Sequence, residues 1–181
     1  SGYSYVRFFD FRLNPEHPPL VKAIAALPLL FYKLNFPTDI TAWTTVINGQ
    51  WDMGRAFLYG VGNDPDLIVR VSRLGPMILF LLLIILVYMW SRELMGPLWA
   101  LLPTVMLALS PSFLAHGEYV TTDVGASLGI ALGLYFFLKM LRAPSWKSVL
   151  VGGVAFGIAQ LMKFSAVLLI PCLGFLALVY A

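Results

Sequence analysis

The sequence predicts an all-α protein, a polytopic bundle of transmembrane helices with an interfacial helix on the extracytoplasmic side. Hydrophobic residues make up 60% of the 181 residues and charged residues only 12%, with a mean hydropathy of +0.84. Soluble domains carry about 25% charged residues and are at most about half apolar. The apolar segments lack the strict alternation of a transmembrane barrel, so helices are the way to satisfy the backbone in lipid.

Other compositional features narrow the classes of function. The net charge of +3 is small and the basic residues are scattered, so no nucleic-acid partner is indicated. The single cysteine, Cys172, lies in an apolar run and excludes an internal disulfide. No basic stretch followed by an apolar core follows Ser1, so no cleavable signal is recognised.

Residues 1–74 are predicted to form an extracytoplasmic loop with an interfacial helix over about 18–36. That segment, "PPLVKAIAALPLLFYKLNF", is nearly long enough to cross a membrane but contains Lys22, Pro28 and Lys33. Lysines that reach the headgroups from an amphipathic helix suit a helix lying on the membrane. The following stretch is rich in turn residues and carries scattered aromatic side chains, as in a loop at a membrane interface.

Residues 75–181 are predicted to form the transmembrane bundle, with four to five spans. The apolar segments run over 75–91, 97–114, 124–138 and 148–181, and the last is long enough for two passes broken near Lys163 and Pro171.

Charge in the short loops predicts the orientation. The loop 139–147 carries three basic residues and no acid, whereas "HGEYVTTD", residues 116–123, carries two acids and no lysine or arginine. The positive-inside rule therefore places 139–147 in the cytoplasm and Asp123 outside. Counting crossings then puts Arg73 and Lys163 on the same side as Asp123.

The stretch "NPEHPPLVK", residues 14–22, has two compatible interpretations. It suits a helix start, with Asn14 as the cap and Glu16 near the positive end of the helix dipole. It also suits a reaction cleft, because a carboxylate beside the His17 imidazole can bind a divalent ion, orient an acceptor or exchange a proton. Lys22, one turn further on, could pair with a phosphate.

The stretch "HGEYVTTD" also has two interpretations. Thr122 or Asp123 could simply cap the next helix. Alternatively, Asp123 lines an external site with His116 and Glu118, since ionisable groups at a membrane boundary are costly unless hydrated or functional. Lys163 and Arg73 either reach lipid headgroups or bind an anion. Together these acids and bases suit a substrate with a phosphate and a polyprenyl tail, plus an acceptor to be deprotonated.

Four stretches in one order carry a family resemblance: "DFRLNPEHPPLVKAIAALPLL", "RVSRLGPMILFLLLIILVYMWSRELMGP", "LALSPSFLAHGEYVTTD" and "GGVAFGIAQLMKFSAVLLIPCL". Together they resemble the N-terminal part of the C-type (GT-C) integral-membrane glycosyltransferases, in the phospholipid-carrier-dependent, protein O-mannosyltransferase-like branch.

The resemblance implies a membrane enzyme that moves a sugar from a polyprenyl-phosphate-linked donor to an unidentified protein, lipid or glycan acceptor. It implies a bacterial inner-membrane protein with its active site on the extracytoplasmic face. It implies catalytic roles for Asp123 and Glu16. It also implies that the following side chains contact the substrate: His17, Lys22, His116, Lys163 and Arg73. The resemblance implies no particular cofactor, and Glu16 and His17 could hold a divalent metal.

The sequence departs from the family at one point. The family's first external loop begins with an Asp-Glu pair, the expected catalytic base, which would precede Ser1 and is not in this sequence. The expectation is therefore a fragment of a longer enzyme.

Two other classes of protein suit parts of the sequence. A non-catalytic subunit of a larger membrane complex could pack through the small-residue faces at Gly125/Gly129/Gly133 and Gly152/Gly153/Gly157. A transporter is less favoured, because no span interior carries a charged pair.

Overall fold

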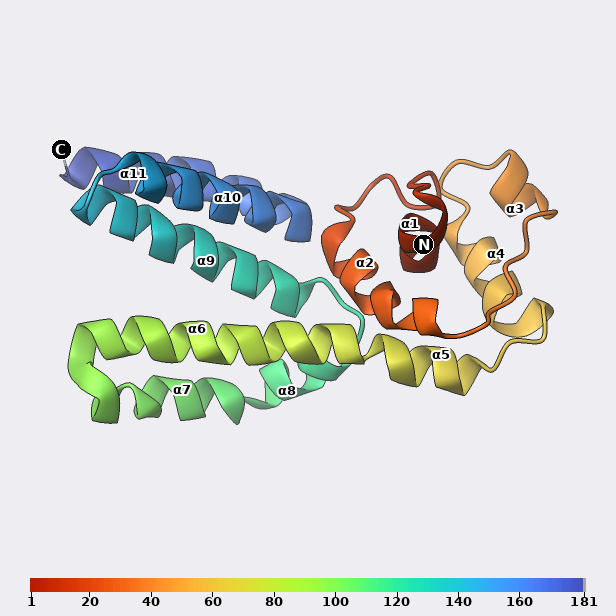
Figure 1. Ribbon diagram of the computed structural model, residues 1–181, viewed down its shortest axis with the longest axis horizontal. Coiled ribbons are helices and arrows are strands. Elements are labelled where there is room, and N and C mark those ends of the chain that lie inside the picture. The colour runs from red at the N-terminus through yellow and green to blue at the C-terminus, as the bar shows by residue number, and fades with distance from the viewer. Residues whose placement is uncertain (181) are drawn as a thin grey trace.

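The computed structural model describes residues 1–180, in two parts that meet end to end (Figure 1). The first part consists of short helices: α1 (Gly2–Phe8), α2 (Leu20–Ala26), η1 (Leu27–Phe31), α3 (Thr41–Thr44), α4 (Gln50–Arg55), η2 (Ala56–Gly60) and α5 (Pro65–Ser72). The second is a bundle that contains the longest helices, α6 and α9: α6 (Leu74–Trp99), α7 (Leu101–Ala108), α8 (Pro111–Glu118), α9 (Asp123–Arg142), α10 (Trp146–Met162), η3 (Phe164–Leu168) and α11 (Leu169–Tyr180). The all-α class predicted from the sequence is confirmed.

The centre of the bundle is the contact of α9 with α6 and α10. Leu79 and Leu83 of α6 pack against Val124 and Leu128 of α9 in one buried apolar cluster. On the other side of α9, a Cβ atom at Gly129 would lie 2.8 Å from the Cα of Ala159. Glycine at this position therefore lets α9 and α10 approach closely, as small residues do between membrane helices.

Two helices of the described chain are long and apolar enough to cross a membrane: the continuous stretch Pro65–Trp99, which joins α5 and α6, and α9. Large apolar side chains on the outer face of α6, including Ile78 and Leu81, are more than half exposed. Such broad apolar surface is costly in water and is typical of a lipid-facing surface.

The two other predicted apolar segments are divided into shorter helices. Segment 97–114 follows a sharp kink at Gly96, which adopts φ 82°, and breaks again before Pro111. Segment 148–181 breaks at Lys163, which is extended between α10 and η3. The chain then turns back, so that α11 runs antiparallel to α10 (Figure 1).

The segment predicted as an interfacial helix over about 18–36 is helical only from Leu20 to Phe31. Its α-helical part ends at Ala26, and the 3₁₀ turn η1 takes over with Pro28 in its first turn. The segment lies across the end of the bundle (Figure 1). A Cβ at Gly75 would lie 2.6 Å from the Cα of Ala25, so α2 rests directly on the start of α6.

An aromatic cluster around Phe36 holds the short helices together. The ring centroid of Phe36 lies 4.7 Å from that of Phe8, 4.9 Å from that of Trp43 and 5.7 Å from that of Phe57. Aromatic pairs at these separations add about 0.5–1.5 kcal/mol beyond simple burial. The N-terminal part therefore has its own core beside the bundle.

Candidate functional site

Three of the predicted site residues meet at the end of the bundle that carries α2. The Lys163 ammonium donates to Asp123 Oδ1 at 2.7 Å, and His116 Nδ1 lies 3.6 Å from Asp123 Oδ2. Asp123 begins α9, His116 is in the last turn of α8, and Lys163 follows α10. Three helix ends therefore bring one carboxylate, one ammonium and one imidazole together.

The side chains of this Asp123 cluster remain accessible to a ligand. The Asp123 side chain is 49% exposed and that of Lys163 is 38% exposed. A cavity of about 110 Å³ lies beside them, lined by His116, Asp123, Ser127 and Phe113, among others. It has room for a small polar group next to the carboxylate.

A larger cavity, of about 540 Å³, lies between the N-terminal part and the start of α6, and it contains Lys22 and Arg73. The Arg73 guanidinium lies 5.3 Å from the centre of the Tyr119 ring, and its buried Nε has no hydrogen-bond partner among the described residues. A guanidinium with unused donors is suited to a phosphate or carboxylate ligand.

Lys22 faces this cavity from α2. Its Nζ donates to the backbone carbonyl of His17 at 3.2 Å and lies 5.4 Å from the Tyr5 ring centre. Burial lowers the pKa of Lys22 to about 8, because the charged form loses hydration. An anion bound beside it would therefore restore a favourable environment for the charge.

The loop before α9 connects the two places. Tyr119 and Val120 line the cavity that contains Lys22 and Arg73, and Asp123 follows three residues later. Helix α2 also packs against the first turn of α9, because a Cβ at Gly125 would lie only 2.5 Å from Val21 Cγ2. The Asp123 cluster and the Lys22–Arg73 cavity thus lie at one end of the bundle.

Glu16 and His17 belong neither to the Asp123 cluster nor to the Lys22–Arg73 cavity. Glu16 Oε1 accepts a hydrogen bond of 2.8 Å from Asn48 Nδ2, and the cavity beside Asp123 does not include Glu16. His17 lines a separate cavity of about 310 Å³ with Gln160 and Phe164. In residues 1–180, no group of three or more His, Cys, Asp or Glu side chains could hold a metal ion, so no third side chain of these types joins Glu16 and His17.

The sequence analysis missed the amide side chains that hold Glu16. Asn48 also accepts from Gln50 Nε2 at 3.3 Å, and Gln50 in turn accepts from Asn14 Nδ2. The dipeptide Asn48-Gly49 indicated only a turn. No local pattern could place it beside a residue 32 positions earlier.

Comparison with family models finds a match over more than half of the chain. Residues 68–180 match the family described as dolichyl-phosphate-mannose-protein mannosyltransferase. The matched range includes Arg73, His116, Asp123 and Lys163, and it starts after Glu16, His17 and Lys22. No curated protein and no solved structure matches the chain.

Proposed function

The chain belongs to the dolichyl-phosphate-mannose-protein mannosyltransferase family, and from this membership we propose that it transfers a sugar from a polyprenyl-phosphate carrier to an acceptor. The family implies a glycosyltransferase of the mannosyltransferase type in a membrane. We further propose that the reaction takes place on the extracytoplasmic face of a bacterial inner membrane, and we assign roles to individual residues below. The observation that carries it is the Asp123–Lys163–His116 cluster next to a cavity containing two basic side chains.

We assign the donor phosphate to Lys22 and Arg73. Their cavity of about 540 Å³ has the volume of a typical small-molecule site. When the bond between the sugar's anomeric carbon and the phosphate oxygen breaks, negative charge grows on the leaving lipid phosphate. Two fixed cations stabilise that charge, and such electrostatic stabilisation is often the largest contribution to catalysis.

We assign the acceptor to Asp123. Its carboxylate can accept a hydrogen bond from an acceptor hydroxyl and orient the oxygen toward the sugar, with His116 beside it. The ammonium of Lys163 holds the carboxylate in place, at 2.7 Å. Because the ammonium has two further N–H donors, Lys163 could also contact the donor phosphate, as the resemblance implies, while it keeps this ion pair.

Glu16 and His17 keep a supporting role in the proposal. Glu16 is oriented by Asn48, and both residues precede α2. We propose that this first loop guides the acceptor toward the Asp123 cluster, whereas the family resemblance implies a catalytic role for Glu16 and a substrate contact for His17.

The orientation follows from the distribution of basic residues. Lys139, Arg142 and Lys147 lie at the end of the bundle opposite Asp123, as expected if that end faces the cytoplasm. This orientation puts Asp123, Lys22 and Arg73 on the side of the membrane where the family uses polyprenyl-linked sugars.

The test is replacement of Asp123 by Asn in the full-length protein. Membranes that contain the variant are given a polyprenyl-phosphate-linked radiolabelled mannose, and transfer to endogenous acceptors is measured. Because misplacement of a reacting group costs about 100-fold, transfer should fall by about that factor or more. Asp39→Asn is the matched control, since Asp39 is an exposed carboxylate in a bend of the N-terminal part.

Undiminished transfer by Asp123→Asn, at equal amounts of protein in the membrane, would contradict the role of Asp123. An equal loss in Asp39→Asn would show that the effect is not specific to the site.

A further inference from the structure

The Lys22–Arg73 cavity also contains two amide side chains that the proposed function does not use. Asn14 and Gln50 line it together with both basic residues. Asn14 is only 7% exposed, and its side-chain oxygen, Oδ1, is buried without a hydrogen-bond partner among the described residues. A buried acceptor without a partner is costly, so a ligand that offers a donor to Asn14 gains binding free energy.

A carboxylate sets the direction of the hydrogen bonds between the amides. An ionised Glu16 can only accept, so Asn48 turns its Nδ2 toward Glu16, at 2.8 Å. The Asn48 oxygen then accepts from Gln50 Nε2 at 3.3 Å, and the Gln50 oxygen accepts from Asn14 Nδ2. Reversal of any one amide would bring two donors or two acceptors together. The atom left over at the end of the chain is therefore an acceptor, Asn14 Oδ1.

The same cavity also contains unused donors. Arg73 lines it, and its buried Nε is a donor without a partner in residues 1–180. The Gln50 amide nitrogen carries two N–H groups, and its hydrogen bond to Asn48 uses one of them. A ligand that suits this cavity therefore carries hydroxyl groups as well as an anionic group.

The ring of Tyr5 connects Asn14 with Lys22. The Tyr5 hydroxyl donates to the Asn14 backbone carbonyl at 3.0 Å, and Lys22 Nζ lies 5.4 Å from the centre of the same ring. Asn14 and the Lys22 ammonium thus both contact one aromatic side chain. A ligand of the size of a sugar phosphate can reach both of them.

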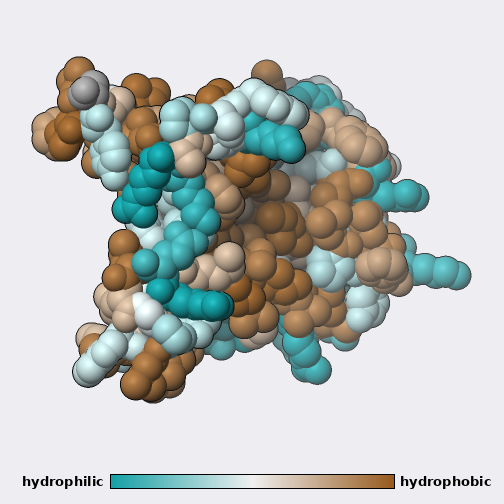
Figure 2. Space-filling model, turned by 60° about the vertical axis from the view of Figure 1, so that its left-hand side comes forward, coloured by the Kyte–Doolittle hydropathy of each residue, from teal (hydrophilic) through white to brown (hydrophobic). Residues whose placement is uncertain are grey.

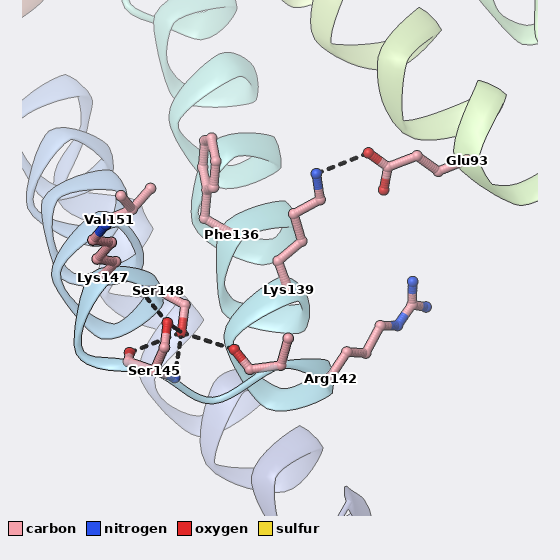
Figure 3. A pocket seen from close by; sticks show the side chains of 9 residues that line it. Glu93, Phe136, Lys139, Arg142, Ser145, Lys147, Ser148 and Val151 are labelled. Carbon is pink, nitrogen blue, oxygen red and sulfur yellow. Dashed lines mark hydrogen bonds and ion pairs between the residues drawn. The ribbon is translucent and has the colours of Figure 1, made fainter.

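The acceptors of the cavity at the opposite end of the bundle, by contrast, are already used. Hydrophilic residues gather at that end, flanked by apolar surface (Figure 2). The carboxylate of this cavity, Glu93, pairs with Lys139 at 2.8 Å (Figure 3) and accepts from the Tyr135 hydroxyl at 2.6 Å. The hydroxyl groups of Ser145 and Ser148 bond to each other at 3.1 Å. An unused acceptor therefore distinguishes the Lys22–Arg73 cavity from this one.

From these observations, and resting on the proposed function, which places the donor phosphate in this cavity, we propose that Asn14 and Gln50 bind hydroxyl groups of the donor sugar. Asn14 Oδ1 accepts from one sugar hydroxyl, and Gln50 Nε2 donates to a hydroxyl oxygen. The terminal torsion of asparagine is soft, so a small rotation of the amide turns Oδ1 toward the ligand. The two amides thereby select a carrier that bears a sugar over a carrier that bears none.

The alternative is that the amides serve only to fix Glu16 and the loop around it. A purely structural role predicts that their removal changes the affinity for carriers with and without a sugar by the same factor. Contact with the sugar predicts a change for the sugar-bearing carrier alone.

The test titrates two phosphodiesters of equal charge, farnesyl-phosphate-mannose and farnesyl methyl phosphate, into the full-length protein in detergent. Calorimetry gives the two dissociation constants. Wild type should bind the mannosyl ligand about tenfold more tightly, the effect of about one net hydrogen bond. Asn14→Leu and Gln50→Leu should each lose most of this preference and keep the wild-type affinity for farnesyl methyl phosphate, which shows that the cavity is still formed.

A second measurement uses ligands that each lack one hydroxyl group of mannose. At least one of these deoxy ligands should bind wild type about tenfold more weakly than farnesyl-phosphate-mannose. Asn14→Leu should bind that deoxy ligand and its parent equally, because the acceptor for the missing hydroxyl is gone.

Asn35→Leu is the matched control. It removes an exposed amide of the N-terminal part, which donates to the Val61 carbonyl at 2.9 Å. Every affinity should stay as in wild type.

Several results would overturn the proposal: a wild-type protein without preference for the mannosyl ligand or for any single hydroxyl, an unchanged preference in both Asn14→Leu and Gln50→Leu, or an equal loss of both ligands in these variants. The same loss of preference in Asn35→Leu would also overturn it. A wild-type protein that binds neither phosphodiester would instead contradict the proposed function, so the two failures are distinguishable.

Discussion

Lys22 is the basic side chain whose charge depends most on its surroundings. It lies on α2 between a backbone carbonyl and an aromatic ring, and its burial lowers its pKa to about 8. Below pH 8 most molecules carry the ammonium, and above pH 8 most carry the neutral amine. A bound phosphate favours the ammonium, so the pKa of Lys22 is higher in the complex than in the free protein.

Binding of a polyprenyl phosphate should therefore weaken as the pH rises above 8, by up to about tenfold for each pH unit, because proton uptake is then linked to binding. Affinity measured between pH 7 and pH 9.5 checks this. In Lys22→Gln the affinity should be lower and this pH dependence should disappear. The same slope in wild type and Lys22→Gln would exclude Lys22 as its source.

Asn48 combines a left-handed backbone conformation with a polar contact. It adopts a left-handed conformation with φ 64°, and its side chain donates to Glu16. Left-handed residues other than glycine and asparagine are disfavoured by about 1–2 kcal/mol. Substitutions at this position can separate the backbone contribution from the contact with Glu16.

Asn48→Gly and Asn48→Ala both remove the hydrogen bond to Glu16, but only Ala adds strain. We expect similar reductions of sugar transfer in the two variants and a lower stability, by about 1 kcal/mol, in Asn48→Ala alone. Transfer assays and thermal unfolding measure the two effects. Full activity in both variants would mean that the orientation of Glu16 does not matter for transfer.

At the scale of elements, the position of α2 decides whether its basic residue reaches the site. The helix rests on glycines of α6 and α9, where Gly75 faces the Cα of Ala25 and Gly125 faces Val21. A side chain at either glycine would push α2 away from the bundle. Lys22 would then move with it, away from Arg73.

Gly75→Ala should therefore reduce transfer and destabilise the protein by about 1–3 kcal/mol, as overpacked contacts do. Gly153→Ala is the matched control, because nothing lies within 4 Å of a Cβ at Gly153 in α10. Thermal unfolding and transfer are measured for both. Equal stability and equal transfer in the two variants would contradict the close contact between α2 and the start of α6.

At the scale of the whole molecule, the two charged regions lie at opposite ends of one bundle (Figure 1). The Asp123 cluster and the Lys22–Arg73 cavity are at the end near α2, and the basic side chains of Lys139, Arg142 and Lys147 are at the other. With α6 and α9 across the membrane, the two ends face opposite compartments.

Single cysteines can check this orientation in a Cys172→Ala background. Asp39→Cys, in the N-terminal part, should react with a membrane-impermeant maleimide on intact spheroplasts. Pro144→Cys, in the exposed loop between α9 and α10, should react only after the membrane is permeabilised. The reverse pattern would place the Asp123 cluster in the cytoplasm and refute the proposed orientation.

The sequence alone determined the class of molecule, because that class depends on local composition. An apolar run of spanning length specifies a membrane helix wherever it packs, and the all-α bundle is confirmed. The break at Lys163 was likewise predicted, since a charged residue interrupts two apolar runs. The break predicted near Pro171 is not found, because Pro171 lies in the first turn of α11. The resemblance to mannosyltransferase-like enzymes is confirmed by the family match over residues 68–180.

Only the tertiary structure decided which side chains meet. Lys163 pairs with Asp123 across 40 positions, and Asn48 holds Glu16 across 32. The structure also showed that Glu16 lies outside the cavity beside Asp123 and that two predicted spans are divided. Periodicity and helix breakers act over a few residues. Contacts between distant segments depend on how closely whole helices approach, which here is set by small residues on facing surfaces such as Gly75 and Gly125.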